Sequence, residues 1–195
     1  MSKATQEGLS RRGHLHLADA EATEAFGAAV AAWLRARRGA VLFLRGDLGA
    51  GKTTFARGLL RALGVSGAVR SPTYTLLEPY EIGGRTVLHM DLYRLQDPEE
   101  LVALGARDYA PDSSVWIVEW PERGTGFLPA PTLDLAFCHH DAGRRVEFAA
   151  PLPPGPAAGS VLVHGTNDAG QGSTQADFDR LLAELHAANE TARKV

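Results

Sequence analysis

Residues 46–53 read GDLGAGKT, and this stretch decides how the fold is interpreted. It matches the phosphate-binding pattern G-x-x-x-x-G-K-[ST] at every fixed position. Glycines let the backbone fold into a nest of N–H groups, and Lys52 adds a full positive charge. The Thr53 hydroxyl is suited to coordinate the Mg²⁺ that accompanies a nucleoside triphosphate. The stretch predicts a nucleotide site whose expected contacts are Gly46, Gly49, Ala50, Gly51, Lys52, Thr53 and Thr54.

The flanking sequence has the strand and the helix that such a loop needs. Residues 40–45 (AVLFLR) form a short apolar run of strand length. Residues 52–63 are predicted as a helix, because apolar side chains recur there at the spacing of one helical face. Gly64 follows as a C-terminal cap. A glycine-rich turn that happens to contain a lysine is the alternative, and the strand–loop–helix order argues against it.

The composition indicates one globular domain with an appendage. The chain has 195 residues, of which 45% are hydrophobic and 22% are charged. These are ordinary values for a globular protein. The formal net charge of −3 predicts no broad basic surface. Any contact with nucleic acid would therefore be local or made through a partner.

The sequence also indicates the cellular compartment of the protein. Cys138 is the single cysteine, which excludes an internal disulfide framework and a zinc cluster of thiolates. No apolar run approaches the about 20 residues of a membrane span. The N-terminus has no apolar signal segment. We therefore expect a cytoplasmic protein without membrane contact.

Hydrophobic patterns predict a helix from Asp19 and a series of strands. The strands are expected at 74–82, 85–90, 115–118, 132–139 and 144–149. Residues 1–13 are polar and are expected to be loose. Residues 151–160 (PLPPGPAAGS) are typical of a linker. The chain then divides into a P-loop domain over 1–150 and a Pro/Gly-rich linker with a C-terminal helical extension over 151–195.

Two acidic residues follow predicted strands. Asp91 comes after the strand that ends at Met90, and Glu119 comes after residues 115–118. In a parallel α/β sheet, ligands bind just outside the carboxyl ends of the strands. If these strands run parallel to the strand before the loop, both carboxylates meet Lys52 and Thr53, where they could hold Mg²⁺ and orient a nucleophile. The alternative is that either acid merely caps the segment after it.

Three further residues have two interpretations each. Thr73 follows Pro72 where many phosphate-loop enzymes keep a mobile switch threonine that senses the terminal phosphate, and simple turn chemistry explains it equally well. Trp120, beside Glu119, could lie near the nucleotide or belong to the core. His89 is expected to be a packed strand residue rather than a ligand.

Four linked motifs carry a resemblance to a known family. GDLGAGKTT, SPTYTL, HMDLYRL followed by DPEEL, and VEWPERG appear in this order and spacing. From about Leu17 to Ala149 the chain strongly resembles the bacterial TsaE family, the ATPase component of tRNA threonylcarbamoyladenosine biosynthesis. The resemblance implies an α/β fold of the P-loop NTPase type. In that fold, antiparallel strands extend a central parallel sheet, and helices cover both faces.

The resemblance also implies chemistry and partners. The family hydrolyses ATP with Mg²⁺ and acts with the TsaB and TsaD proteins. That complex transfers a threonylcarbamoyl group to an adenosine next to the tRNA anticodon, so contact with tRNA would be indirect. The first 150 residues would then be a P-loop ATPase domain.

By the same resemblance, residues 49–54 bind phosphates, and Thr53 and Glu119 hold Mg²⁺. Asp91 joins Lys52 and Glu119 as a catalytic residue. Residues 71–73 look like a first switch segment, and Trp120 lies in a second.

Other functions share the phosphate loop. A kinase of a small molecule or nucleotide would need an acceptor pocket and usually arginines in a lid; Arg94, Arg107 and Arg123 are available but show no pattern. A GTPase would need an N/T-K-x-D motif, and the sequence has none. A nucleotide-gated binding module would differ only in turnover. Because the motifs contain no arginine directed at the terminal phosphate, we expect slow hydrolysis alone and stimulation by partners.

Overall fold

The computed structural model describes residues 9–69, 71–151 and 183. Its elements, with η for 3-10 helices, are β1 (Leu9–Leu17), α1 (Ala20–Arg35), β2 (Ala40–Arg45), α2 (Lys52–Leu63), β3 (Leu77–Ile82), β4 (Arg85–Asp91), α3 (Glu100–Ala103), η2 (Ala106–Asp108), β5 (Val115–Glu119), η3 (Pro121–Gly124), β6 (Leu133–His140) and β7 (Gly143–Pro151). No helix in this described part is both long and apolar enough to cross a membrane. Apart from positions 151 and 183, the predicted linker and C-terminal extension lie outside the described residues.

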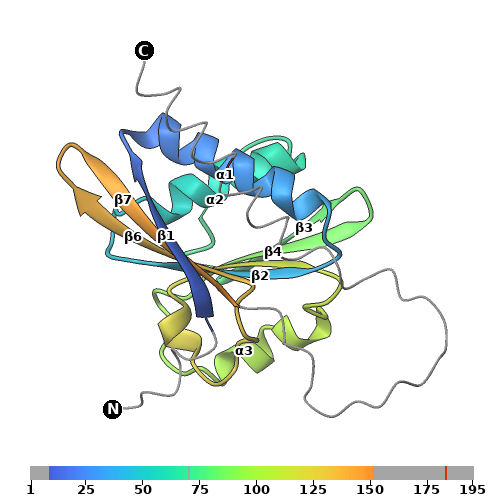
Figure 1. Cartoon of the computed structure of the whole chain (residues 1–195). Helices are drawn as coiled ribbons and strands as arrows, with labels where there is room; N and C mark the ends of the chain where they lie inside the picture. The colour runs from blue at the N-terminus through green and yellow to red at the C-terminus, as the bar shows by residue number, and fades with distance from the viewer. Residues whose placement is uncertain (1–8, 70, 152–182, 184–195) are drawn as a thin grey trace, which may run out of the picture.

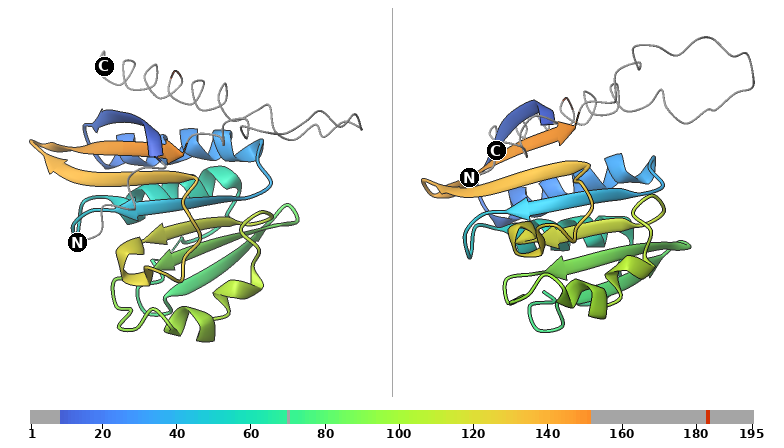
Figure 2. Two further views of the ribbon diagram at one scale, coloured as in Figure 1. Left: turned by 60° about the horizontal axis from the view of Figure 1, so that its bottom comes forward. Right: turned by 90° about the horizontal axis from the view of Figure 1, so that it is seen from below.

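The strands of the described chain form one seven-stranded sheet in the order β1-β7-β6-β2-β5-β4-β3. The centre is parallel, because β2 pairs in parallel with β5 and β6, and β5 does so with β4. Antiparallel strands extend it on both sides, β7 and β1 beyond β6 and β3 beyond β4. Figure 2 shows this arrangement, with β6 and β7 on one side of β2 and β3 and β4 on the other. The predicted sheet is confirmed.

The register of the parallel strands places the carboxyl ends of β2, β4 and β5 side by side. Leu44 of β2 and Asp91 of β4 are both Cα partners of Glu119 in β5. The loop that begins at Gly46 leaves β2 at the same edge. Since the carboxyl ends of parallel strands are where open α/β sheets bind ligands, the sheet brings the phosphate loop and both acids together.

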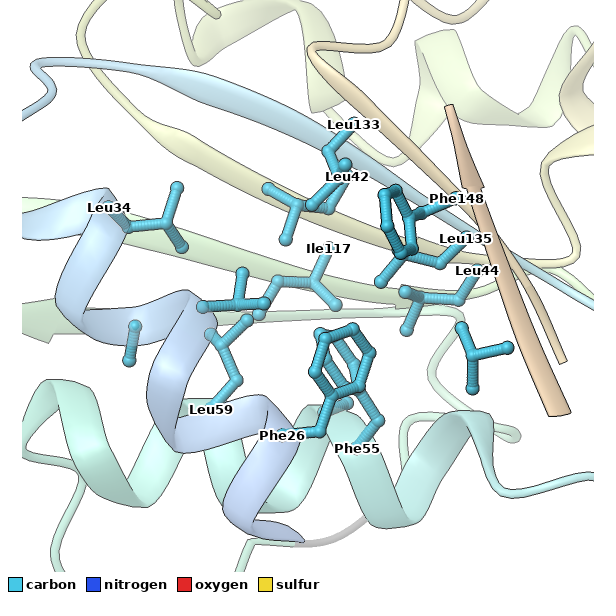
Figure 3. Close-up of a cluster of buried hydrophobic side chains, with 14 of the residues drawn as sticks. Phe26, Leu34, Leu42, Leu44, Phe55, Leu59, Ile117, Leu133, Leu135 and Phe148 are labelled. Carbon is cyan, nitrogen blue, oxygen red and sulfur yellow. The ribbon is translucent and has the colours of Figure 1, made fainter. Parts of the chain in front are cut away.

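Helices α1 and α2 cover one face of the sheet (Figure 1). They approach each other closely because each has a glycine at the crossing. A Cβ atom on Gly27 of α1 would lie 2.4 Å from the carbonyl oxygen of Phe55, and one on Gly58 of α2 would lie 2.3 Å from that of Glu24. Figure 3 shows the core beneath them, which includes Phe26, Leu34, Leu42, Leu44, Phe55, Leu59, Ile117, Leu133, Leu135 and Phe148.

The opposite face is covered by short α3, η2 and the turns around them (Figure 1). Its core consists of Val41, Phe43, Leu88, Met90, Leu92, Leu95, Leu101, Ala106, Trp116 and Val118. Because both faces of the central strands are covered, β5 is buried at every position, as expected for a parallel strand. The prediction of helices on both faces is therefore confirmed.

The expectation of loose residues over 1–13 is wrong for positions 9–13. These residues belong to β1, which pairs with β7, for example Arg12 with Ala149 and Gly13 with Phe148. A Cβ on Gly13 would lie 2.3 Å from the ring of Phe148. The absence of a side chain at Gly13 therefore leaves room for that ring to pack against the strand. Pairing with a strand from the far end of the domain, rather than local hydrophobicity, orders this segment.

The strand predicted from Tyr74 begins later, at Leu77. The backbone turns first, because the Leu76 N–H donates to the carbonyl of Pro72 across 2.6 Å. Leu76 also has a positive φ of 62°. The turn leaves Thr73 in a loop beside the end of β4 instead of drawing it into the sheet.

Candidate nucleotide-binding site

The phosphate loop joins β2 to α2 through glycines with positive φ. Gly46, Gly49 and Gly51 have φ values of 125°, 79° and 109°. Residues other than glycine rarely adopt this backbone region. Gly51 is the N-cap of α2, and no side chain caps that end of the helix. The first N–H groups of α2 therefore remain available to an anion, as the sequence predicts.

Gly46 also meets a tertiary requirement. A Cβ atom there would lie 2.1 Å from the carbonyl oxygen of Phe137 in β6. The loop thus rests directly on the backbone of the neighbouring parallel strand.

Lys52 lies within the loop with only 4% of its surface exposed. Its Nζ donates to the carbonyl oxygens of Gly46 at 2.6 Å and Asp47 at 2.8 Å. Burial lowers the pKa of Lys52, while the carboxylates of Glu119 and Asp91 act to raise it. The loop therefore holds a cationic group at its centre, where phosphate oxygens would arrive.

Glu119 is the last residue of β5 and is 1% exposed. Its Oε2 accepts a hydrogen bond from the Thr53 hydroxyl at 2.8 Å, and its Oε1 lies 2.9 Å from Nε2 of His89. The two predicted Mg²⁺ ligands are thus direct neighbours, although they lie far apart in the sequence.

Asp91 lies at the end of β4 and accepts hydrogen bonds from the predicted switch segment. Its Oδ2 accepts from the Thr73 hydroxyl at 2.6 Å and from the Ser71 hydroxyl at 3.0 Å. Its Oδ1 accepts from the backbone N–H of Tyr93 at 3.1 Å. The Thr73 hydroxyl therefore contacts a predicted catalytic carboxylate, and its role as a switch residue stays a prediction.

Trp120 has a left-handed backbone with φ of 58°. This conformation costs about 1–2 kcal/mol for a residue with a side chain, and such strain often accompanies functional sites. The indole ring lies 4.0 Å from Nζ of Lys52 and 5.0 Å from the ring of Tyr93. The structure shows both surroundings, because the ring lies beside the loop lysine and also packs against the buried cluster that contains Met90 and Val118.

These residues surround a pocket of about 290 Å³, which is lined by Leu48, Gly49, Gly51, Lys52, Thr53, Thr54, Ser71, Thr73, Asp91, Tyr93, Glu119 and Trp120. Two predicted contacts, Gly46 and Ala50, are not part of the lining. Ala50 is fully buried, and Gly46 acts through backbone geometry. The remaining predicted site residues all face the pocket.

Sequence reasoning missed Leu48 and Tyr93 in the lining and the link from His89 to Glu119. Leu48 occupies a variable position of the loop pattern, so the pattern carries no signal for it. His89 and Asp91 are two residues apart in β4 and share one face of the strand. That period of two was the available signal.

A larger groove of about 1110 Å³ lies on the sheet away from α1 and α2 and includes Phe43, Arg45, Asp134 and Ala136 in its lining. No residue of the stretch 46–54 contributes to it. It is therefore separate from the candidate nucleotide site.

The residues present fit a Mg²⁺ ion shared with a nucleotide. Within residues 9–69, 71–151 and 183, no group of three or more His, Cys, Asp or Glu side chains could hold a metal by itself. Mg²⁺ usually takes one or two protein oxygens and completes its shell with phosphates and water. The adjacent oxygens of Thr53 and Glu119 are a donor set of this kind.

Comparison with known proteins identifies the family. The family model described as "Threonylcarbamoyl adenosine biosynthesis protein TsaE" matches residues 17–146. The chain belongs to the TsaE family. This confirms the resemblance carried by the four sequence motifs.

Individual relatives agree with this assignment. The tRNA threonylcarbamoyladenosine biosynthesis protein TsaE of Haemophilus influenzae is 46% identical over 60% of this chain and 74% of its own length. The protein of the same name from Nostoc sp. is 36% identical over 75% of this chain and 91% of its own. The crystal structure of Bacillus subtilis YdiB superposes with a TM-score of 0.62 at 27% identity, covering 91% of this chain and 95% of that one.

Proposed function

We propose that this TsaE-family chain is a Mg²⁺-dependent ATPase that acts in the threonylcarbamoyladenosine modification of tRNA. The family connects it to that pathway. The single observation that carries the ATPase proposal is the 2.8 Å hydrogen bond from the Thr53 hydroxyl to Oε2 of Glu119. It unites the loop threonine with a carboxylate at the edge of the parallel sheet, beside the buried cation of Lys52.

The roles of the residues follow from their positions. The N–H groups of residues 49–54 and the ammonium of Lys52 would bind the phosphates of ATP. Thr53 and Glu119 would hold Mg²⁺, which neutralises charge on the phosphate oxygens. Asp91 and Glu119 are the carboxylates at hand to orient the attacking water. Thr73 would sense the terminal phosphate through the metal, and its hydrogen bond to Asp91 would couple this contact to the carboxylate.

The composition of the pocket favours slow hydrolysis by the isolated chain. In the described part of the protein, no arginine contributes to the lining of this pocket. Charge or ordering supplied in trans is worth about 10³–10⁵ in rate in other phosphate-loop enzymes. We therefore assign stimulation to TsaB and TsaD, the partners implied by the family resemblance. In this cytoplasmic assembly, contact with tRNA is made through the complex.

The test is Glu119→Gln, measured by nucleotide affinity and phosphate release with and without TsaB and TsaD. Glutamine keeps the volume but loses the charge that holds Mg²⁺, so we expect stimulated hydrolysis to be largely lost while ATP binding is better preserved. Glu122→Gln is the matched control, because Glu122 is 45% exposed and pairs with Arg45 at 3.4 Å.

Turnover of Glu119→Gln equal to that of the parent in the complex would transfer the leading role to Asp91. A small-molecule kinase is the competing function. It predicts that ADP forms only when an acceptor is added, so the same assay includes candidate acceptors without partner proteins.

A further inference from the structure

His89 lies beneath the candidate site without entering it. It is fully buried and does not line the nucleotide pocket. In β4 it lies on the same face as Val87 and Asp91, which is the sheet face that α2 covers. An apolar side chain at this position would satisfy the packing, so the imidazole needs a separate explanation.

The polar contact of His89 is directed at Glu119. Nε2 of His89 lies 2.9 Å from Oε1 of Glu119, and both side chains are almost completely buried, at 0% and 2% exposed. A carboxylate oxygen accepts hydrogen bonds, so the histidine tautomer with the proton on Nε2 is the one that can donate to it. Nδ1 is buried and has no hydrogen-bond partner among the described residues. Because leaving a polar atom buried and unpaired is unfavourable, the bond to Glu119 is what accounts for a histidine here.

The two oxygens of Glu119 therefore have separate partners. Oε1 is held from within the sheet by His89, and Oε2 faces the Thr53 hydroxyl at 2.8 Å. A glutamate side chain has several rotatable bonds, and a donor on one oxygen limits the orientation of the other.

We propose that His89 is a positioning residue for the nucleotide reaction: it fixes the Glu119 carboxylate so that Oε2 stays directed at Thr53 and at the metal shared with ATP. The inference rests on the proposed ATPase function. It assigns a role in metal binding to a residue that neither contacts the nucleotide pocket nor coordinates the ion.

The test compares His89→Leu with His89→Gln in the full-length chain. Leucine fills the space without a donor, whereas the amide nitrogen of glutamine can take the place of Nε2. The readout is the ratio of ATP affinities measured by calorimetry with Mg²⁺ and with EDTA. We expect leucine to reduce this ratio by about tenfold to a hundredfold, as for a lost hydrogen bond to a charged group. Affinity in EDTA should stay close to that of the parent, and glutamine should restore most of the ratio.

Met90→Leu serves as the packing control, since Met90 is fully buried in the adjacent position of β4. Glu119→Ala supplies a second readout. In that background His89→Leu should have no further effect on the ratio, because the carboxylate that His89 positions is gone.

The failures are distinguishable. A parent protein whose ATP affinity does not depend on Mg²⁺ would overturn both the proposed function and this inference. If the ATP affinity of the parent depends on Mg²⁺ and His89→Leu has the same ratio of affinities with Mg²⁺ and with EDTA, only this inference is overturned. If His89→Leu melts too low to be measured, a folded His89→Gln variant that has lost the ratio would also overturn it.

Discussion

The hydroxyl of Thr73 donates to Oδ2 of Asp91 across 2.6 Å. The bond joins the loop after α2 to the last residue of β4, and the Ser71 hydroxyl adds a second contact at 3.0 Å to the same oxygen. A hydroxyl that donates one proton keeps lone pairs for other partners. Thr73 can thus bind Asp91 and still offer an oxygen toward a metal, as a switch threonine requires.

Thr73→Val should lower partner-stimulated phosphate release by about tenfold to a hundredfold, the effect of losing a hydrogen bond to a charged group. Affinity for ATP in EDTA should change little, because Lys52 and the loop amides remain. Thr75→Val is the control, since Thr75 is exposed. Equal phosphate release by the two variants would show that Thr73 has no special part in turnover.

Lys52→Ala should weaken the binding of MgATP by about one to two decades. The reason is the loss of a charge-assisted contact worth about 1.5–3 kcal/mol. Arg61→Ala removes a positive charge from the far end of the same helix, where Arg61 pairs with Glu24 at 3.1 Å, and should bind like the parent. A dissociation constant for Lys52→Ala that calorimetry cannot distinguish from the parent value would reject the nucleotide site.

Gly46→Ala should destabilise the fold far more than Gly67→Ala. Both glycines have positive φ, at 125° and 90°, so both variants bear backbone strain of about 1–2 kcal/mol. Only at Gly46 would the new Cβ meet another backbone, 2.1 Å from the Phe137 carbonyl, while at Gly67 it would meet nothing within 4 Å.

We expect melting temperatures about 5–20 °C lower for Gly46→Ala and about 2–8 °C lower for Gly67→Ala, as judged from overpacking and strain energies and the size of the domain. Scanning calorimetry measures both. Equal shifts would mean that the contact with Phe137 contributes nothing.

Deletion of residues 156–195 should leave ATP binding and cooperative melting intact. Every residue that lines the pocket lies between Leu48 and Trp120, and β7 ends at Pro151, before the deleted segment. The comparison is the melting curve and the MgATP dissociation constant of the truncated and full chains. A truncated protein that folds but no longer binds ATP would show that the tail belongs to the site. The predicted division into a domain over 1–150 and an extension over 151–195 would then be wrong.

The local features of the site were predictable. β2 and α2 have the predicted bounds, 40–45 and 52–63, and Gly64 caps the helix with φ of 116°. These elements depend on contiguous signals, namely an apolar run, a helical period and a glycine cap. Asp19, at which the helix is predicted to begin, is the N-cap of α1 and accepts from the Ala22 N–H at 2.8 Å.

The prediction was incomplete where the outcome depended on distant partners. β1 was not predicted, because it is ordered by pairing with β7. β3 begins at Leu77 instead of Tyr74, because the carbonyl of Pro72 accepts a hydrogen bond from the Leu76 N–H in a preceding turn. The sequence predicts that Asp91 and Glu119 meet at the loop if their strands run parallel to β2, and the parallel pairing of β5 with β2 and β4 fulfils this condition.

The sequence by itself determined the phosphate loop, because glycine, lysine and threonine act there through contiguous backbone geometry. Only the tertiary structure decided which carboxylate each loop residue meets. His89 and Glu119 are 30 residues apart, and Thr53 and Glu119 are 66 apart. Their contact depends on strand order and register, which are set by burial of side chains across the whole sheet. No local pattern encodes that information.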